Sequence, residues 1–283
     1  MSNTLGPDFV DWGCPIDWAA PLNRSLVGWW LVAPNRMGFG TSAARDMVRR
    51  NRDAVTAALP ATSTSGWQAA TRRGGWGSFA FDGTDDYVAC GDPASMAFGT
   101  GAFSVAFWRK GPNADLNQKY IVSKYGATGW GIVQTSDAWA GGAGKKIGFV
   151  LDAGGAGARA WSTTAAVDDG QWHHVVCVSD GSAGFIYIDG VAAALTTNRN
   201  VGGWPNVTTA TALNIGRYSG GSNYDQSSLD DVRIYNRALP AVEVRRLYQA
   251  SAAGYPDELH RVEPWFSTAQ IAGMLLARRR AVA

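Results

Sequence analysis

The sequence predicts an all-β protein, a two-sheet antiparallel β-sandwich of the jelly-roll type with a short helix after the last strand. Two observations predict this class. The charged residues suit strands and turns, since 20 of the 25 basic residues are Arg and 20 of the 23 acidic residues are Asp, whereas helical proteins use Glu and Lys freely. Eight or more short apolar segments are separated by turn residues and by no helical pattern, which indicates a sandwich rather than a parallel sheet.

Short apolar or alternating segments bounded by turn residues predict the strands. They are residues 26–32, 78–81, 87–90, 103–107, 147–151, 171–178, 184–189, 213–215 and 229–235. The first is a continuous apolar run, as in a strand buried on both faces. The dipeptides Asp82-Gly83 and Asp189-Gly190 predict turns, because glycine supplies the positive φ that tight hairpins need.

One helix is predicted after the last strand. Pro240 suits a first helical turn, and Val244, Leu247 and Tyr248 follow at the spacing of one helical face. This face is expected to dock on the sandwich, and Gly254 is expected to end the helix.

The composition excludes several classes of protein. Hydrophobic content is 46% and aromatic content 11%, which excludes intrinsic disorder. The three cysteines, Cys14, Cys90 and Cys177, are far apart and odd in number, so they form no disulfide scaffold and fit a reducing cytoplasm. A net charge of +2 argues against nucleic acid as a partner. No secretory signal or membrane-length apolar run is visible, so we expect synthesis in the cytoplasm and no membrane insertion.

Four stretches in order resemble the laminin-G-like, concanavalin A-like jelly-roll family. They are residues 81–88 (FDGTDDYV), 171–176 (QWHHVV), 187–191 (YIDGV) and 229–239 (LDDVRIYNRAL). The resemblance covers roughly residues 24 to 250 and implies a module that binds carbohydrate or protein, or in some members an enzyme.

The enzyme branch of this family is not expected here. Glycoside hydrolysis commonly needs two carboxylates flanking the bond, and the resemblance implies a Glu pair with an Asp between on one strand. This chain has no Glu before Glu243, and no strand carries Asp at the corresponding spacing. The pairs Asp85-Asp86 and Asp168-Asp169 lie at turns, where adjacent carboxylates are expected to diverge or to cap. The sequence therefore predicts no catalytic residues and a protein that is not an enzyme.

Two histidines and one aspartate are considered as metal ligands. His173 and His174 are neighbours on a strand, so they point to opposite faces and cannot share a metal. In the segment 229–235, the two-residue period puts Asp230 on the face of Val232 and Ile234, where a buried carboxylate needs a partner.

Two partners for Asp230 stay open. Related folds place a structural Ca²⁺ near this strand, which Asp46 would share, and the alternative is an ordinary hydrogen-bond or Arg partner. On the other face of the strand, Asp231 and Arg233 are expected to form a pair that contributes little energy.

Exposed aromatic rings are the expected means of sugar binding, because they stack on the C–H face of a sugar. Four aromatic residues in predicted loops are candidates: Trp139, Trp204, Tyr218 and Tyr224. The alternative for each is that it covers a sheet rim or fills a subunit contact.

Two segments flank the predicted sandwich, which spans residues 23–250. Residues 1–22 form an aromatic arm, laid either on the same domain or on a neighbouring subunit, and residues 251–283 form a tail with a short helix. Four aromatic residues of these segments are expected to make subunit contacts: Trp12, Trp18, Trp265 and Phe266.

With cytoplasmic synthesis, these flanking segments resemble those of laminin-G-like proteins of tailed bacteriophages, displayed on the virion as head decorations or tail components. The resemblance implies a structural virion protein that contacts other virion proteins and copies of itself and adheres to glycans. The alternative is a cellular carbohydrate-binding or adhesion module, and a glycoside hydrolase is the third hypothesis.

Overall fold

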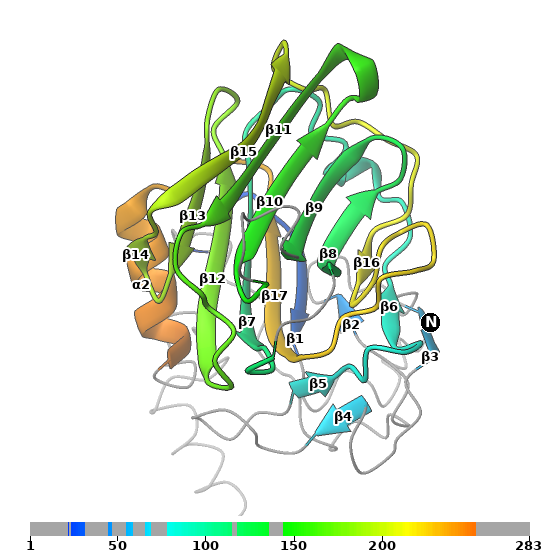
Figure 1. The fold of residues 1–283 in the computed structure, drawn as a ribbon, viewed down its shortest axis with the longest axis vertical. Helices are drawn as coiled ribbons and strands as arrows, with labels where there is room; N and C mark the ends of the chain where they lie inside the picture. Colours follow the sequence, from blue (N-terminus) through cyan, green and yellow to red (C-terminus); the bar gives the residue numbers. More distant parts are fainter. Residues whose placement is uncertain are drawn as a thin grey trace, which may run out of the picture.

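The computed structural model describes residues 22, 24–31, 45–46, 55–58, 66–68, 78–114, 118–135 and 144–252. For residues 29–31, 45–46, 55–58 and 66–68 it describes the backbone only. Two antiparallel sheets lie face to face, with the sheet that we name sheet B in front of sheet A in Figure 1. The predicted β-sandwich class is confirmed.

Sheet A has the strand order β14-β13-β12-β7-β17-β1-β2, and β5 pairs with β17 and with β4. Its strands are β1 (Leu26–Leu31), β2 (Arg45–Asp46), β4 (Gly66–Gln68), β5 (Ser78–Ala80), β7 (Phe103–Lys110), β12 (Trp172–Ser179), β13 (Gly184–Ile188), β14 (Val191–Ala192) and β17 (Ser228–Tyr235).

Sheet B has the strand order β15-β11-β10-β9-β8-β16-β6-β3. Its strands are β3 (Val55–Ala58), β6 (Tyr87–Ala89), β8 (Lys119–Tyr125), β9 (Gly129–Gln134), β10 (Ile147–Asp152), β11 (Gly157–Thr163), β15 (Leu195–Gly202) and β16 (Asn214–Ile215). Short 3₁₀ turns occur at Ala94–Met96 and Gly154–Ala156.

The main core lies between the two sheets. Alternate side chains of the central strands point into it, for example Phe103, Val105 and Phe107 of β7 and Phe149 of β10, all fully buried. The rings of Phe103 and Phe149 meet edge to face, with 5.8 Å between their centroids. Trp130 of β9 completes this aromatic centre, 5.3 Å from Phe103. Rings of this size contribute most of the buried apolar area of a sandwich core.

The helix α2 (Ala241–Ala252) covers the outer face of sheet A. Val244 and Leu247 are fully buried against Ala106, Val176 and other outward residues of this sheet. Trp108 of β7 donates from its indole nitrogen to the Ser251 hydroxyl at 3.0 Å. The predicted helix and its docking face are confirmed.

The segments predicted from residues 26–32 to 229–235 are strands, with boundary shifts of one to three residues at their ends. Five strands of sheet B, however, were not predicted: β3, β8, β9, β11 and β15. The same holds for β2, β4 and β14 of sheet A. Glycines interrupt β9, and β15 is polar along both faces, so neither shows the apolar run or alternation that identifies a strand.

The face predicted for Asp230 is wrong, because β17 contains a bulge. The register with β7 shifts between Asp230 and Arg233, and Asp231 has a φ of +54°. As a result Leu229 and Val232, three residues apart, both enter the main core. Asp230 lies instead opposite Trp108, whose ring contacts α2 on the outer side of sheet A. A bulge inserts one residue and so reverses the alternation beyond it.

Asp231 and Arg233 do pair, as predicted, with a Nε–Oδ1 distance of 2.8 Å. Both side chains are buried, whereas the small energy expected for the pair stays a prediction. Breaking a buried pair leaves an uncompensated charge in the interior, which is costly.

The arm before residue 22 and the tail after residue 252 lie outside the described residues. The predicted contacts of Trp12, Trp18, Trp265 and Phe266 therefore stay predictions, as do the boundaries of the three predicted domains.

Candidate functional site

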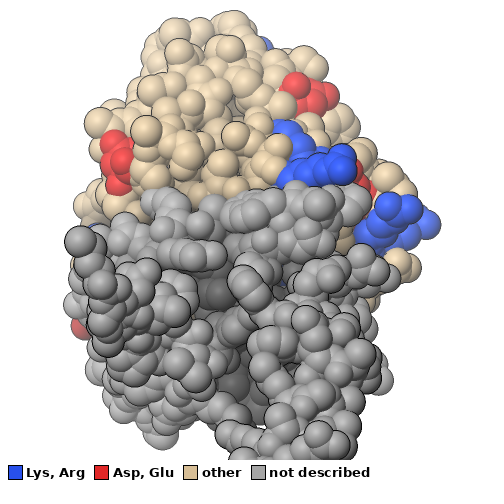
Figure 2. Space-filling view, turned by 180° about the vertical axis from the view of Figure 1, so that it is seen from behind, with Lys and Arg blue, Asp and Glu red and all other residues tan. Residues whose placement is uncertain are grey.

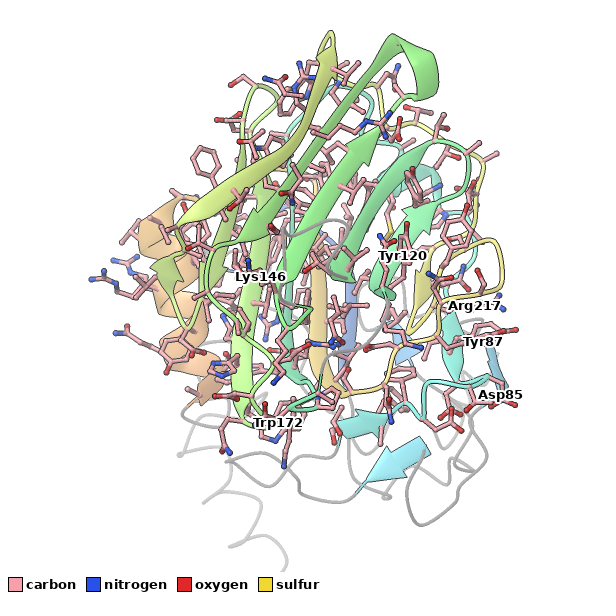
Figure 3. All side chains as sticks on the ribbon, viewed as in Figure 1. Asp85, Tyr87, Tyr120, Lys146, Trp172 and Arg217 are labelled. Atoms are coloured by element: carbon pink, nitrogen blue, oxygen red, sulfur yellow. The ribbon has the colours of Figure 1, made fainter. Side chains whose placement is uncertain are left out.

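Five of the nine tyrosines of the chain lie at one side of sheet B and the loop beside it. They come from β6, from β8 and from residues 216–225, the loop that follows β16. We name this set with its arginine the tyrosine surface: Tyr87, Tyr120, Tyr125, Tyr218, Tyr224 and Arg217. Figure 3 shows Tyr87 and Arg217 near the β6 edge and Tyr120 further along the sheet.

Three of these rings form one cluster on the outer face of β8. Tyr120 and Tyr125 are stacked with centroids 6.0 Å apart, and Tyr218 lies 5.0 Å from Tyr120. The Tyr218 hydroxyl donates to the carbonyl of Gly126 at 2.9 Å, and the Tyr125 hydroxyl donates to Asp152 at 3.0 Å. Both hydroxyls are therefore held in place, and the rings of Tyr125 and Tyr218 stay half-buried.

Tyr120 is the most buried ring of the cluster. It is only 7% exposed, and its ring lies over Gly131 of β9, where an added Cβ would come within 3.1 Å of the ring. Burial raises the pKa of Tyr120, and burial together with the Asp152 carboxylate raises the pKa of Tyr125 to about 12. Both phenols therefore stay protonated and act as neutral hydrogen-bonding groups.

The remaining rings flank the guanidinium of Arg217. This group lies 3.3 Å from the centroid of Tyr87, and the ring of Tyr224 lies 6.4 Å from that of Tyr87. The Nε of Arg217 donates to the Asn214 side chain at 3.2 Å. Among the residues that the structure describes, no carboxylate pairs with Arg217, so its charge is balanced by the ring face alone.

The loop of residues 216–225 is fixed by its first and last residues. Gly216 has a φ of +88° and approaches Phe81 so closely that a Cβ would lie 2.5 Å from the ring. Ser123 of β8 donates to the carbonyl of Arg217 at 2.9 Å. At the other end the buried Asp225 accepts two hydrogen bonds from Arg109. Three side chains of the tyrosine surface are thus held by contacts with both sheets.

Sheet B contains few acidic residues in its described strands. In its described strands Asp152 is the single acidic residue. Its carboxylate accepts from Tyr125 and from Arg199, the latter at 3.4 Å. The outward positions beside it are small or apolar: Gly131, Gly148, Val150 and Ala160.

The structure brings two of the four predicted sugar-stacking residues together. Tyr218 and Tyr224 belong to the tyrosine surface. Trp204 instead packs against Trp161, 6.2 Å away, and lies under the Arg159 guanidinium at 5.7 Å, which is the rim position named as its alternative. Trp139 lies outside the described residues.

Sequence reasoning missed four members of the tyrosine surface: Tyr87, Tyr120, Tyr125 and Arg217. Tyr87 was included in a predicted strand, and the alternation Tyr87-Val88-Ala89 could have placed it outward, since Val88 is buried in the main core. Tyr120 and Tyr125 lie in a strand that was not predicted at all.

The predicted metal ligands are not joined by any described contact. Asp230 is fully buried, and its Oδ1 accepts the Asp231 N–H at 2.7 Å. For Asp46 the structure describes the backbone, which pairs with Trp30. A Ca²⁺ ion at this place stays a prediction. His173 and His174 do point to opposite faces, since His174 packs near Trp108 and Tyr248 under α2 whereas His173 meets Asp189.

On the opposite side of the molecule, Figure 2 shows small groups of basic and acidic residues on the coloured part of the surface, within a mostly uncharged background. Within the described part of the chain, no helix is both long enough and apolar enough to cross a bilayer.

Comparison with protein families gives one match. Residues 82–245, more than half of the chain, match the family described as the concanavalin A-like lectin/glucanases superfamily. No curated protein matches the sequence.

Solved structures with the same fold include toxin binding domains. The binding domain of Paraclostridial mosquitocidal protein 1 has a TM-score of 0.58 and 15% identity over 81% of this chain and 53% of its own. The botulinum neurotoxin serotype G binding domain has a TM-score of 0.56 and 14% identity over 80% and 51%. A botulinum neurotoxin type C structure, concerned with cell entry through two ganglioside molecules, has a TM-score of 0.55 and 13% identity over 82% and 52%. The chain thus spans about half the length of these structures.

Proposed function

Since this chain belongs to the concanavalin A-like lectin/glucanases superfamily, we propose that it is a non-enzymatic, lectin-like binding protein whose tyrosine surface binds a glycan. The observation that carries the proposal is the combination of half-buried tyrosine rings with an arginine that no described carboxylate neutralises. Sugar sites combine aromatic faces, which stack on C–H groups, with a few oriented polar groups that bind hydroxyls.

Binding is favoured over hydrolysis by the chemistry of sheet B. Two carboxylates must flank a glycosidic bond, about 5 to 10 Å apart, for either stereochemical outcome. Asp152 is the single acid among the described strands of this sheet, and Tyr125 and Arg199 already bind its carboxylate. No second acidic residue in the described strands of this sheet is available to form the pair that hydrolysis needs.

The solved structures support the proposal by analogy. Two of those that we compared are binding domains of toxins, and the botulinum neurotoxin type C structure concerns interaction with gangliosides. Gangliosides present sugars at a cell surface, so the same sandwich architecture serves glycan recognition elsewhere. A shared fold does not transfer a site, and for that reason the proposal depends on the tyrosine surface itself.

The experiment is a glycan array followed by titration calorimetry of the best ligand. We expect Tyr224→Ala and Arg217→Ala each to weaken binding about five- to tenfold, the equivalent of ~1 kcal/mol for a lost stacking or polar contact. The matched control is Tyr248→Ala, which removes a half-buried tyrosine that packs against Trp108 on the other sheet. It should bind with wild-type affinity. Unchanged affinity in both Tyr224→Ala and Arg217→Ala, or no bound glycan at all, would contradict the proposal.

We propose in addition that the sandwich is displayed on the particle of a tailed phage, through the segments 1–22 and 251–283. This rests on the resemblance of the two flanking segments, together with the expected cytoplasmic synthesis, to such virion proteins. Deleting both segments from the phage-encoded protein should abolish incorporation into particles while the isolated sandwich keeps its glycan affinity. Normal incorporation of the truncated protein would exclude this role and leave a cellular adhesion module as the alternative.

A further inference from the structure

Three carboxylates converge in the turn of residues 82–86, which precedes β6. One oxygen or more from each of Asp82, Asp85 and Asp86 lies within 4.8 Å of the others. The sequence predicts that Asp85 and Asp86 either diverge or cap the turn. Asp86 does cap it, because its Oδ2 accepts the N–H of Asp82, and the carboxylates converge rather than diverge. Figure 3 shows Asp85 beside Tyr87 at the β6 edge of the sandwich.

The turn is held in shape by the first of these residues. The Oδ1 of Asp82 accepts the N–H of Thr84 at 2.7 Å and that of Asp85 at 3.4 Å. Gly83, with a φ of +82°, packs on Gln226, where an added Cβ would lie 3.0 Å from the glutamine side chain. The carboxylates of Asp82 and Asp85 stay exposed to solvent.

The third carboxylate is buried and lacks a full set of partners. Asp86 is fully buried, and its Oδ2 accepts the N–H of Asp82 at 2.9 Å. Its Oδ1 is inaccessible to solvent and accepts no hydrogen bond from the residues that the structure describes. A buried charged oxygen without a partner is costly, so the protein places an acceptor here that a bound group would satisfy.

The three carboxylates lie without a cation beside them. Among the described side chains, no lysine or arginine forms an ion pair with any of the three. The turn therefore gathers three carboxylates, one of them buried, that a bound cation would neutralise.

We propose that the turn of residues 82–86 is a Ca²⁺ site, with Asp82, Asp85 and Asp86 as its carboxylate ligands. Ca²⁺ binds oxygen ligands at 2.3–2.6 Å, so two ligands of one ion lie no more than about 5 Å apart, which the three carboxylates satisfy. The exposed side of the turn leaves room for the waters that complete six to eight ligands. Mg²⁺ is disfavoured because it demands a near-ideal octahedron and gives up its waters reluctantly.

This site is separate from the predicted one at Asp46 and Asp230. Those residues belong to sheet A, whereas the turn leads into sheet B. The proposal of a Ca²⁺ site also does not depend on glycan binding, because it rests on the residues of the turn alone.

The test is titration calorimetry of CaCl₂ into the EDTA-treated full-length protein, with no glycan present. We expect one ion to bind in the submillimolar to millimolar range typical of sites without a rigid cage, about 10⁻⁴ to 10⁻³ M. Asp85→Asn and Asp86→Asn should each weaken binding roughly tenfold or more, since each removes one charged ligand. The matched control is Asp180→Asn, an exposed aspartate whose Oδ1 caps a similar turn at Ser182 and Ala183 without neighbouring carboxylates. It should bind Ca²⁺ as the wild type does.

Thermal unfolding supplies a second measurement. Ca²⁺ should raise the unfolding midpoint of the wild type and of Asp180→Asn, but not that of Asp86→Asn, because a ligand stabilises only the state that binds it. In EDTA, Asp86→Asn should unfold at the wild-type temperature or above, since the amide removes a repelled charge. Asp85 is exposed, so Asp85→Asn tests the proposal even if Asp86→Asn folds poorly. The proposal fails if the wild type shows neither heat nor a midpoint shift, or if Asp85→Asn and Asp86→Asn bind Ca²⁺ as tightly as the wild type.

Discussion

His173 is the described side chain best placed to make the stability of this protein depend on pH near neutrality. Its Nδ1 lies 2.8 Å from Asp189, and its Nε2 lies 3.3 Å from Asp169. The hydrogen bond to Asp189 is the main cause of the raised pKa of His173. Burial alone would lower this pKa, and the negative charges of Asp189 and Asp169 raise it further. The imidazolium is thus held between two carboxylates.

The expected result follows from the sign of this shift. A histidine whose pKa is raised by folding stabilises the native state fully below its unfolded pKa of about 6.5 and loses that contribution as the pH rises through the folded pKa. Urea denaturation at pH 6 and pH 8 should show the free energy of unfolding falling for the wild type more than for His173→Gln. Asp169→Asn, which removes the longer contact, should show an intermediate slope. Equal slopes for wild type and His173→Gln would contradict the assignment.

Arg109 closes one end of the core with a charged network instead of apolar side chains. It donates to Asp168, Asp225, Ser227 and Gln134, all at 2.7–3.0 Å, and is 1% exposed. Burial alone would lower the pKa of Arg109, but Asp168 and Asp225 outweigh it and raise that pKa further above its ordinary value. The guanidinium therefore stays charged under all native conditions.

Replacing Arg109 should destabilise the protein strongly. Arg109→Met leaves Asp168 and Asp225 buried without a cation, and we expect the free energy of unfolding to fall by about 3–5 kcal/mol. Arg109→Lys should recover only part of this loss, because an ammonium cannot bridge two carboxylates in a planar fork. The control is Arg199→Met, whose half-exposed pair with Asp152 should cost no more than about 1 kcal/mol. Guanidinium denaturation measures all three.

Single residues of the site were partly predictable from sequence. Tyr218 and Tyr224 lie among Gly and Ser residues, where an aromatic ring is conspicuous, and the structure assigns both to the tyrosine surface. Tyr87 and Arg217 could not be linked in this way, since 130 positions separate them and only the pairing of β16 with β6 brings them together. A contact between residues so far apart in the sequence leaves no local sequence pattern.

At the level of elements, α2 is the clearest success of the sequence pattern. Val244 and Leu247 repeat at helical spacing, and both are fully buried on sheet A. Leu247→Ala should lower the free energy of unfolding by about 2–5 kcal/mol, since it removes buried atoms and leaves a cavity. Val242→Ala changes an apolar residue of the same helix that is 56% exposed and should change it by less than about 0.5 kcal/mol. Similar losses for both variants in urea denaturation would mean that α2 does not dock as described.

Two of the missed strands, β9 and β11, share a physical cause. Their outward positions hold Gly131 and Ala160 rather than polar residues. Without polar residues on the outer face, the two-residue period that marks a half-buried strand disappears. The bulge at Asp231 had a similar effect on β17, because one inserted residue exchanges the two faces.

For the whole molecule, the fold class could be predicted but the strand order could not. Turn dipeptides and apolar segments are local and identify a sandwich. The order that places β17 between β7 and β1, and β16 between β6 and β8, depends on contacts between distant segments, whose formation is governed by loop closure and core packing. The tyrosine surface is a product of that order and was therefore predictable only in part.

The closed core makes its cysteines reporters of global unfolding. Cys90 is 6% exposed and Cys177 fully buried, both lie in the main core, and burial raises the pKa of the Cys177 thiol. In a Cys14→Ser background, we expect both thiols to be inert to a thiol reagent in the native state and to react at the rate of global unfolding in denaturant. Reaction of either thiol without denaturant, faster than the far-ultraviolet signal is lost, would show that the two sheets separate locally.

The loop of residues 216–225 gives the protein an exchangeable recognition segment. Two residues anchor the loop: Gly216 packs against Phe81, and Asp225 pairs with Arg109. Both anchors lie in the interior, whereas the positions between them carry the tyrosine rings and the Arg217 guanidinium. A library randomised from Arg217 to Tyr224 would therefore keep the scaffold folded while it varied the chemistry presented outside. Selection from such a library should yield new sugar preferences without repacking of the core between the two sheets, in the way that hypervariable loops diversify an antibody.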